Sequence, residues 1–322
     1  MNENEKYKDC FKPAWWLPGA HLQTLWPTFC RRKIKNIPLQ RERIELADGD
    51  FIDLNWTEEN NGPIVLILHG LEGSLSSPYA KGMLYAMRAR GWRGVLMHFR
   101  GCSGEMNRSV RSYHSGETED LANIIEVLMK HNKPLAAVGF SLGGNVLLKW
   151  LGESGKNNPL QAAVAISVPF DLSKAVMRIQ KGFSRVYDQH FVRMLCKKMR
   201  NKFAVLPAPI ELSVLEELRT LRDFDDKITA PLHGFLNADD YYHKCSSRQF
   251  LKNISVPTLL LQAKDDPFMT EDLLPHPFEL SSDVTLELTE QGGHVGFVSG
   301  SMPWRATYWL EKRVPQFLKE YL

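Results

Sequence analysis

The sequence lacks the cysteine and histidine patterns that mark disulfide-rich, redox or metal proteins. Its 322 residues include five cysteines, an odd number, and no two of them have the C-x-x-C spacing. We therefore expect reduced thiols, as in a cytosolic protein. Several histidines also lack a repeated spacing with carboxylates or cysteines, so the sequence predicts no zinc site around them: His98, His114, His233 and His243.

Long apolar runs and a strong charge of one sign are missing as well. No stretch approaches the roughly 18 continuous apolar residues of a membrane span, and residues 1–9 are polar and charged where a secretory signal has an apolar core. We expect a cytoplasmic protein without a transmembrane segment, and we leave open a transient contact with a membrane surface. The net charge of +3 is too small to indicate nucleic-acid binding, which requires clustered basic residues.

What the sequence does contain is an alternation of apolar strands with helices. A hairpin with an Asp-Gly turn comes first, over residues 43–46 and 51–56. The runs that follow are continuously apolar, which predicts strands buried on both faces of a parallel sheet. Because such strands are joined by right-handed helical crossovers, the predicted fold class is α/β, with a mostly parallel, doubly wound sheet. The expected strands are residues 64–68, 94–99, 135–138, 162–168, 257–262 and 284–288, and the expected helices are 78–90, 118–130 and 145–151.

The same patterns divide the chain into an arm, a core and an insertion. Residues 1–38 form the predicted arm. Its residues 10–38 are aromatic and interrupted by prolines, so we expect an irregular segment that packs near the mouth of the site. Residues 39–168 and 252–322 form the α/β core, which ends in an amphipathic helix over about residues 304–321. Residues 169–251 predict helices without buried strands, in the position of a lid that controls access to the site. We interpret the basic face of this insertion as solvated surface, with a lipid-headgroup surface as the alternative.

Ser141 lies in the pattern G-x-S-x-G, between a predicted strand and a predicted helix. This pattern is typical of a nucleophile elbow, in which a sharp turn raises the serine above the sheet. Glycine is needed at 139 and 143 because a side chain there would collide with neighbouring backbone. A glycine-rich turn without chemistry is the plain alternative, but the strand before Ser141 and the helix after it favour the elbow.

Two further strand ends carry residues that can activate a serine. Asp265 and Asp266 follow one predicted strand, and His294 follows the last one. Because the carboxyl ends of parallel strands share one edge of a sheet, these residues can converge on Ser141. An imidazole can accept the serine proton, and a buried carboxylate can fix its tautomer. Each residue alone has an ordinary interpretation as a loop histidine or a turn aspartate, whereas the chain order Ser, Asp, His is that of α/β-hydrolases.

The backbone around Ser141 predicts an oxyanion hole. The expected donors are the N–H groups of Leu142, directly after the serine, and of Leu71, in the turn after the first parallel strand. Gly70 permits a close approach of the backbone, and we expect Gly70 and Phe140 to contact the substrate. Glu72 is unfavourable there, because its carboxylate would oppose the oxyanion. We predict that it points away, held by a cation or by backbone donors.

Together these residues resemble a known family. The resemblance is to the YheT-like branch of the α/β-hydrolases, also called family 4 of the AB hydrolase superfamily, and it spans nearly the whole chain. It implies a serine hydrolase that acts on carboxylic esters, with relatives linked to acyl-ester and phospholipid metabolism. The segments that carry it, besides the elbow, are residues 21–24, 69–74, 98–104, 113–118, 265–268 and 292–297.

The resemblance leaves the acid of the site open. It slightly favours Asp265, with Asp266 anchoring the loop, whereas alignment of the preceding strand with generic hydrolases favours Asp266. Arg100 and Ser103 follow another strand end, where they either line the pocket or hold their loop.

The sequence therefore predicts a serine esterase with an acyl-enzyme intermediate and without a metal or organic cofactor. Its expected partner is a small-molecule ester, a lipid included, with a short to medium acyl chain. Three alternatives stay open: an acyltransferase, a thioesterase, and a non-catalytic lipid-binding protein. The intact Ser141 and His294 argue against the last.

Overall fold

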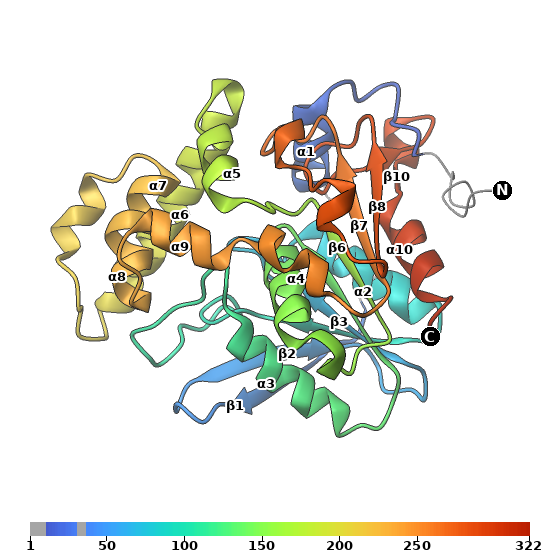
Figure 1. Cartoon of the computed structure of the whole chain (residues 1–322), viewed down its shortest axis with the longest axis horizontal. Coiled ribbons are helices and arrows are strands. Elements are labelled where there is room, and N and C mark those ends of the chain that lie inside the picture. The colour runs from blue at the N-terminus through green and yellow to red at the C-terminus, as the bar shows by residue number, and fades with distance from the viewer. Residues whose placement is uncertain (1–10, 31–36) are drawn as a thin grey trace.

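An eight-stranded sheet forms the centre of the molecule (Figure 1). The computed structural model describes residues 11–30 and 37–322, and the strand order is β1-β2-β4-β3-β5-β6-β7-β8. Strand β2 pairs antiparallel with β1 and β4, and the other neighbouring pairs are parallel. This is the mostly parallel α/β sheet, with an antiparallel hairpin at one edge, that the sequence predicts. The strands are β1 (Gln40–Glu45), β2 (Phe51–Trp56), β3 (Ile64–Leu68), β4 (Arg93–Met97), β5 (Leu135–Phe140), β6 (Ala162–Ile166), β7 (Thr258–Ala263) and β8 (Val284–Thr289).

Helices cover both faces of this sheet, as the continuously apolar strands require. Every residue of β3 is buried. Its side chains alternate, so that Leu66 and Leu68 join one apolar cluster and Val65 and Ile67 join the other. The first cluster includes side chains of α3 (Thr118–Met129) and α4 (Leu142–Ser154). The second includes side chains of α2 (Pro78–Ala89) and α10 (Leu310–Leu318), so the sheet is doubly wound.

The structure describes every residue of the segment 169–251, and this segment contains helices and no strand. Figure 1 shows its helices α6 to α9 gathered beside the sheet, with α5 above them. They enclose an apolar cluster of their own, which includes Leu195, Met199, Phe224 and Ile228. We call residues 169–251 the helical segment. Its helices are α5 (Leu172–Ile179), α6 (Arg185–Phe203), α7 (Leu221–Phe224), α8 (Ala230–His233) and α9 (Ala238–Cys245), with a π-helical turn at Asp225–Thr229.

The N-terminal arm differs from the sequence-based expectation of an irregular segment. Ala20–Phe29 form the helix α1, although Pro27 lies within it. Pro27 falls in the last turn, so the hydrogen bond that it cannot donate is lost only near the end of the helix. Tertiary contacts hold the helix against the core. The buried side chain of Gln23 donates to the carbonyl of Val298 at 3.1 Å and accepts from the N–H of Val298 at 2.7 Å. Residues 1–10 and 31–36 of the arm lie outside the described residues.

The C-terminal helix is shorter than predicted. It begins at Leu310 rather than near residue 304, because Thr307–Tyr308 (β10) pair with Val298–Ser299 (β9). The predicted helical pattern therefore included residues that form a small two-stranded sheet. Of the helices in the described part of the chain, none is both long and apolar enough to cross a membrane.

Candidate active site

Ser141 occupies a strained turn between β5 and α4. Its backbone angles are φ 50° and ψ −117°, a positive φ that residues other than glycine rarely adopt. A Cβ atom at Gly139 would lie 2.5 Å from the carbonyl oxygen of Gly143. A Cβ atom at Gly143 would lie 2.5 Å from the carbonyl oxygen of His69. Both glycines are therefore required sterically, as the sequence pattern predicts.

A chain of hydrogen bonds connects Ser141 with two residues that follow β7 and β8. The Nε2 atom of His294 lies 2.9 Å from Ser141 Oγ, and its Nδ1 atom lies 2.9 Å from Asp266 Oδ2. The Asp266 side chain is fully buried and also accepts from the N–H of Phe268 at 2.9 Å. Because an ionised carboxylate can only accept, the proton of the neutral imidazole belongs on Nδ1. His294 Nε2 is then free to accept the hydroxyl proton of Ser141.

The structure corrects the slight preference for Asp265. Asp265 Oδ1 accepts a hydrogen bond from the N–H of Gly293 at 2.9 Å, which holds the histidine loop, while Asp266 contacts the imidazole. The two neighbours exchange their expected places because adjacent residues of a turn direct their side chains to different sides. Burial is the main cause that raises the pKa of Asp265.

Two further residues hold His294 in place, and sequence reasoning assigned neither of them to the site. Thr24 Oγ1, in α1, accepts from the N–H of His294 at 2.9 Å. The ring of Phe268 stacks on the imidazole, with the ring centroids 4.1 Å apart. Both residues belong to segments on which the family resemblance depends, 21–24 and 265–268, and that signal could have found them.

Two backbone N–H groups near Ser141 have no hydrogen-bond partner within the described ranges 11–30 and 37–322. They are those of Leu142, the first residue of α4, and of Leu71, in the turn that the Gly73 N–H to Gly70 carbonyl hydrogen bond closes at 3.0 Å. Both residues line the cavity that contains Ser141. Such free donors are what an oxyanion hole needs.

His69 and Tyr79 fix the position of this turn. His69 Nε2 accepts from the N–H of Phe99 at 3.2 Å, so its Nδ1 carries the proton and donates to the Gly70 carbonyl at 2.7 Å. Burial lowers the pKa of His69 to about 3, which keeps this neutral tautomer. Tyr79 OH accepts from the N–H of Gly70 at 2.9 Å. A Cβ atom at Gly70 would lie 3.3 Å from Ser141 Cβ, which explains the close approach that the sequence predicts.

Glu72 is held by a cation, as predicted. Its Oε1 atom accepts from Lys198 Nζ at 2.7 Å and from Tyr113 OH at 2.7 Å. The same Tyr113 oxygen accepts from the N–H of Glu72 at 2.8 Å. The carboxylate beside the candidate oxyanion hole is therefore paired with a positive charge.

Ser141 and His294 open into a mainly apolar cavity of about 850 Å³. Gly70 and Phe140, the predicted substrate contacts, line it. The rest of the wall comes from three parts of the chain. They are α1, the loops of the core and the helical segment, with side chains such as Leu25, Phe29, Leu71, Val176, Ile179, Leu195 and Phe224.

Arg100 and Ser103 hold their loop and are not part of the cavity wall. Arg100 donates two hydrogen bonds to Asp120, both of 2.7 Å, and Ser103 Oγ donates to Asp53 at 2.6 Å. Among the described residues, no group of three or more histidine, cysteine, aspartate or glutamate side chains is placed to hold a metal ion.

The mostly parallel sheet, together with a strained serine at a strand-to-helix turn, defines the α/β-hydrolase class. The family model for the alpha/beta hydrolase fold matches residues 63–301. The chain therefore belongs to the α/β-hydrolase family and, within it, to the YheT-like branch that its motifs resemble.

Individual relatives agree with this assignment. The protein named "Putative esterase YheT" of Escherichia coli (strain K12) is 46% identical over 320 residues, which are 97% of this chain and 94% of the relative. Phospholipase ABHD3 of Mus musculus is 29% identical over 97% of this chain and 78% of its own length. The solved structure of the Pyrococcus furiosus esterase Pf2001 shares the fold, with a TM-score of 0.59 and 18% identity over 88% of this chain and 92% of that one.

Proposed function

We propose that this protein is a serine hydrolase that cleaves carboxylic esters through Ser141, His294 and Asp266. One observation carries the proposal: the unbroken hydrogen-bond chain from the Asp266 carboxylate through the imidazole to the Ser141 hydroxyl. That arrangement can generate a serine nucleophile at neutral pH, which an isolated hydroxyl cannot provide.

The proposed reaction has two steps. Ser141 Oγ attacks the ester carbonyl carbon while His294 Nε2 takes its proton, and Asp266 stabilises the imidazolium that forms. The N–H groups of Leu71 and Leu142 bind the oxyanion of the tetrahedral intermediate. His294 then protonates the leaving alcohol, and a water molecule, deprotonated by the same imidazole, hydrolyses the acyl-enzyme.

The cavity supports an ester with an apolar acyl group. A volume of about 850 Å³ lies in the range of sites that enclose a small ligand. We place the acyl chain against the apolar side chains of the helical segment, such as Ile179 and Leu195, with the carbonyl between Gly70 and Phe140. In this proposal the helical segment acts as the lid. Relatives named esterase and phospholipase support an ester substrate, lipids included, and the acyl chain that we propose for it is short to medium in length.

The proposal is tested by the turnover of a p-nitrophenyl ester series from acetate to palmitate. We expect the wild type to be active, with an optimum at short to medium chains, and the Ser141→Ala variant to lose at least about 10⁴-fold in kcat. A folded Ser141→Ala variant with wild-type turnover would refute the role of Ser141.

A further inference from the structure

The turn that carries the Leu71 amide is held from outside the core. The residue after Leu71 is Glu72, whose φ of 51° is unusual for a residue other than glycine. Such a conformation persists only where the surroundings over-determine it. Here Tyr113 OH bonds to both the N–H and the carboxylate of Glu72, and Lys198 Nζ bonds to the carboxylate.

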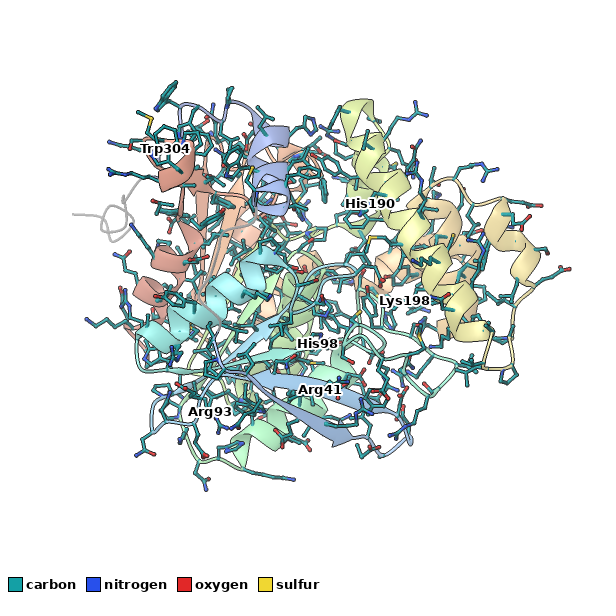
Figure 2. All side chains as sticks on the ribbon, turned by 180° about the vertical axis from the view of Figure 1, so that it is seen from behind. Arg41, Arg93, His98, His190, Lys198 and Trp304 are labelled. Atoms are coloured by element: carbon teal, nitrogen blue, oxygen red, sulfur yellow. The ribbon has the colours of Figure 1, made fainter. Side chains whose placement is uncertain are left out.

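Lys198 comes from the helical segment, 126 residues along the chain from Glu72. It lies on α6, the long helix of that segment, where Figure 2 labels it. Its Nζ atom also lies 3.0 Å from Cys102 Sγ, and it sits 4.9 Å above the centre of the Tyr113 ring. Lys198 is thus a direct polar link between α6 and the turn beside Ser141.

This ion pair is nearly buried, with side-chain exposures of 9% for Lys198 and 10% for Glu72. Burial works against the charged lysine, but the contacts with Cys102 and Glu72 raise the pKa of Lys198, so that it stays charged. Burial raises the pKa of the Cys102 thiol to about 11, which leaves Glu72 as the negative partner. Buried ion pairs contribute little net stability relative to apolar side chains, so stability alone does not account for this one.

The charges explain what the pair contributes to the reaction. An oxyanion on the Leu71 amide would form one residue away from the Glu72 carboxylate, which repels it. Lys198 neutralises that carboxylate and also lines the cavity. Without α6 in its observed position, the turn would lose a hydrogen-bond partner and would present an unpaired negative charge to the oxyanion.

We propose that the Glu72–Lys198 pair couples the position of helix α6 to the oxyanion-binding turn, so that the hole is held and neutralised only while the helical segment covers the site. Lys198 and Glu72 are positioning residues in this account, because they act through the Leu71 amide. The inference rests on the proposed function, in which that amide binds the oxyanion.

Three variants of the full chain test the coupling: Lys198→Met, Glu72→Gln and the double variant. We expect Lys198→Met to lower kcat for a p-nitrophenyl ester by about 10- to 100-fold, somewhat less than the loss of one oxyanion donor, with KM within about twofold. Glu72→Gln should lose less, because it removes the repelling charge. The double variant should regain part of the kcat that Lys198→Met loses. A purely structural pair would instead give similar losses for the two single variants.

Amide hydrogen exchange over residues 69–74 gives a second readout that does not depend on activity. We expect faster exchange in Lys198→Met and in the double variant. The double variant leaves no buried charge unpaired, so it gives the same readout if Lys198→Met does not fold. Arg248→Met is the matched control. Arg248 joins the helical segment to Glu279 of the core by two hydrogen bonds of 2.8 Å, and neither residue lines the cavity. Its loss should leave both readouts unchanged.

The outcomes separate the two proposals. Wild-type kcat and unchanged exchange in Lys198→Met would overturn the coupling, and so would equal effects of Arg248→Met. A wild type that turns over no ester would instead overturn the proposed function. In that case the exchange comparison still decides whether α6 holds the turn.

Discussion

At the residue scale, the direction of each hydrogen bond around His294 decides what the site can do. Asp266 fixes the proton on Nδ1, and the N–H of His294 is anchored by Thr24. Asp265 holds the neighbouring Gly293. The two aspartates therefore differ in what they contact, although they are adjacent and chemically identical.

This difference predicts unequal effects of two isosteric substitutions. Asp266→Asn should lower kcat for a p-nitrophenyl ester by about 10⁴-fold, because an amide in place of the carboxylate stabilises the wrong imidazole tautomer. Asp265→Asn keeps an acceptor for the Gly293 N–H and should lower kcat by less than about 10-fold. Steady-state kinetics of both purified variants measure the two losses of kcat. A larger loss in Asp265→Asn than in Asp266→Asn would restore Asp265 as the acid.

The sequence was informative about this scale only where a motif fixes the backbone. The glycines at 139 and 143 mark Ser141, and the Gly-Gly-His run marks His294. No pattern marks which of two adjacent aspartates faces the histidine, because that depends on how the turn after β7 leaves the sheet. The Glu72 partner was predicted by charge type, but its identity as Lys198 depends on how α6 packs.

At the scale of elements, the helical segment holds a carboxylate that faces the cavity, Asp225. Asp225 begins the π-helical turn between α7 and α8, lines the cavity, and accepts from Thr229 Oγ1 at 2.7 Å and Tyr242 OH at 2.8 Å. Burial raises the pKa of Asp225 to about 6. π-Helical turns are frequent at functional sites, and this one forms part of the cavity wall.

The raised pKa of Asp225 predicts a pH-dependent stability. Between about pH 4 and pH 6 the folded state holds a proton on Asp225 that the unfolded state has lost, so this group's contribution to stability falls as the pH rises through 6. Asp225→Asn removes that loss. We expect the free energy of unfolding of the variant, relative to wild type, to rise by about 2 kcal/mol from pH 4.5 to pH 7.5.

Urea denaturation at the two pH values measures this effect. The comparison between variant and wild type cancels the titration of the other carboxylates. A difference in unfolding free energy that stays constant across the pH range would show that Asp225 titrates in the same way in both states.

Element boundaries were predictable where apolar periodicity alone sets them, as in β3 and α3. The arm and the C-terminus were not, because long-range contacts decide them. Buried Gln23 bonds to Val298 across the molecule, and the β9–β10 pairing takes residues that look helical in sequence. No pattern in the neighbouring sequence indicates such long-range contacts.

At the scale of the whole molecule, Arg100 joins three distant parts of the core. Its guanidinium, 2% exposed, donates to Asp120 in α3 and to Asp48 and Asp50 in the turn of the β1–β2 hairpin, at 2.7 to 3.0 Å. The edge hairpin and the parallel sheet are thereby fastened together beside the loop that follows β4.

Removal of this guanidinium should be costly. Arg100→Gln leaves buried Asp50 and Asp120 without their cation, and we expect a loss of about 3 to 5 kcal/mol in unfolding free energy. Arg88→Gln is the control, because Arg88 forms an exposed pair with Glu58 and its loss should cost at most about 1 kcal/mol. Chemical denaturation of both variants checks the prediction. Equal losses of unfolding free energy would show that the buried network stabilises the fold no more than an exposed ion pair does.

The most direct test of the proposed hydrolase is covalent labelling of the intact protein by a fluorophosphonate probe, followed by mass spectrometry of the labelled peptide. We expect one adduct per chain, on Ser141, with no labelling of Ser141→Ala and slow labelling of His294→Gln. Labelling of the wild type at another residue, or equal labelling of Ser141→Ala, would contradict the assignment of Ser141 as the nucleophile.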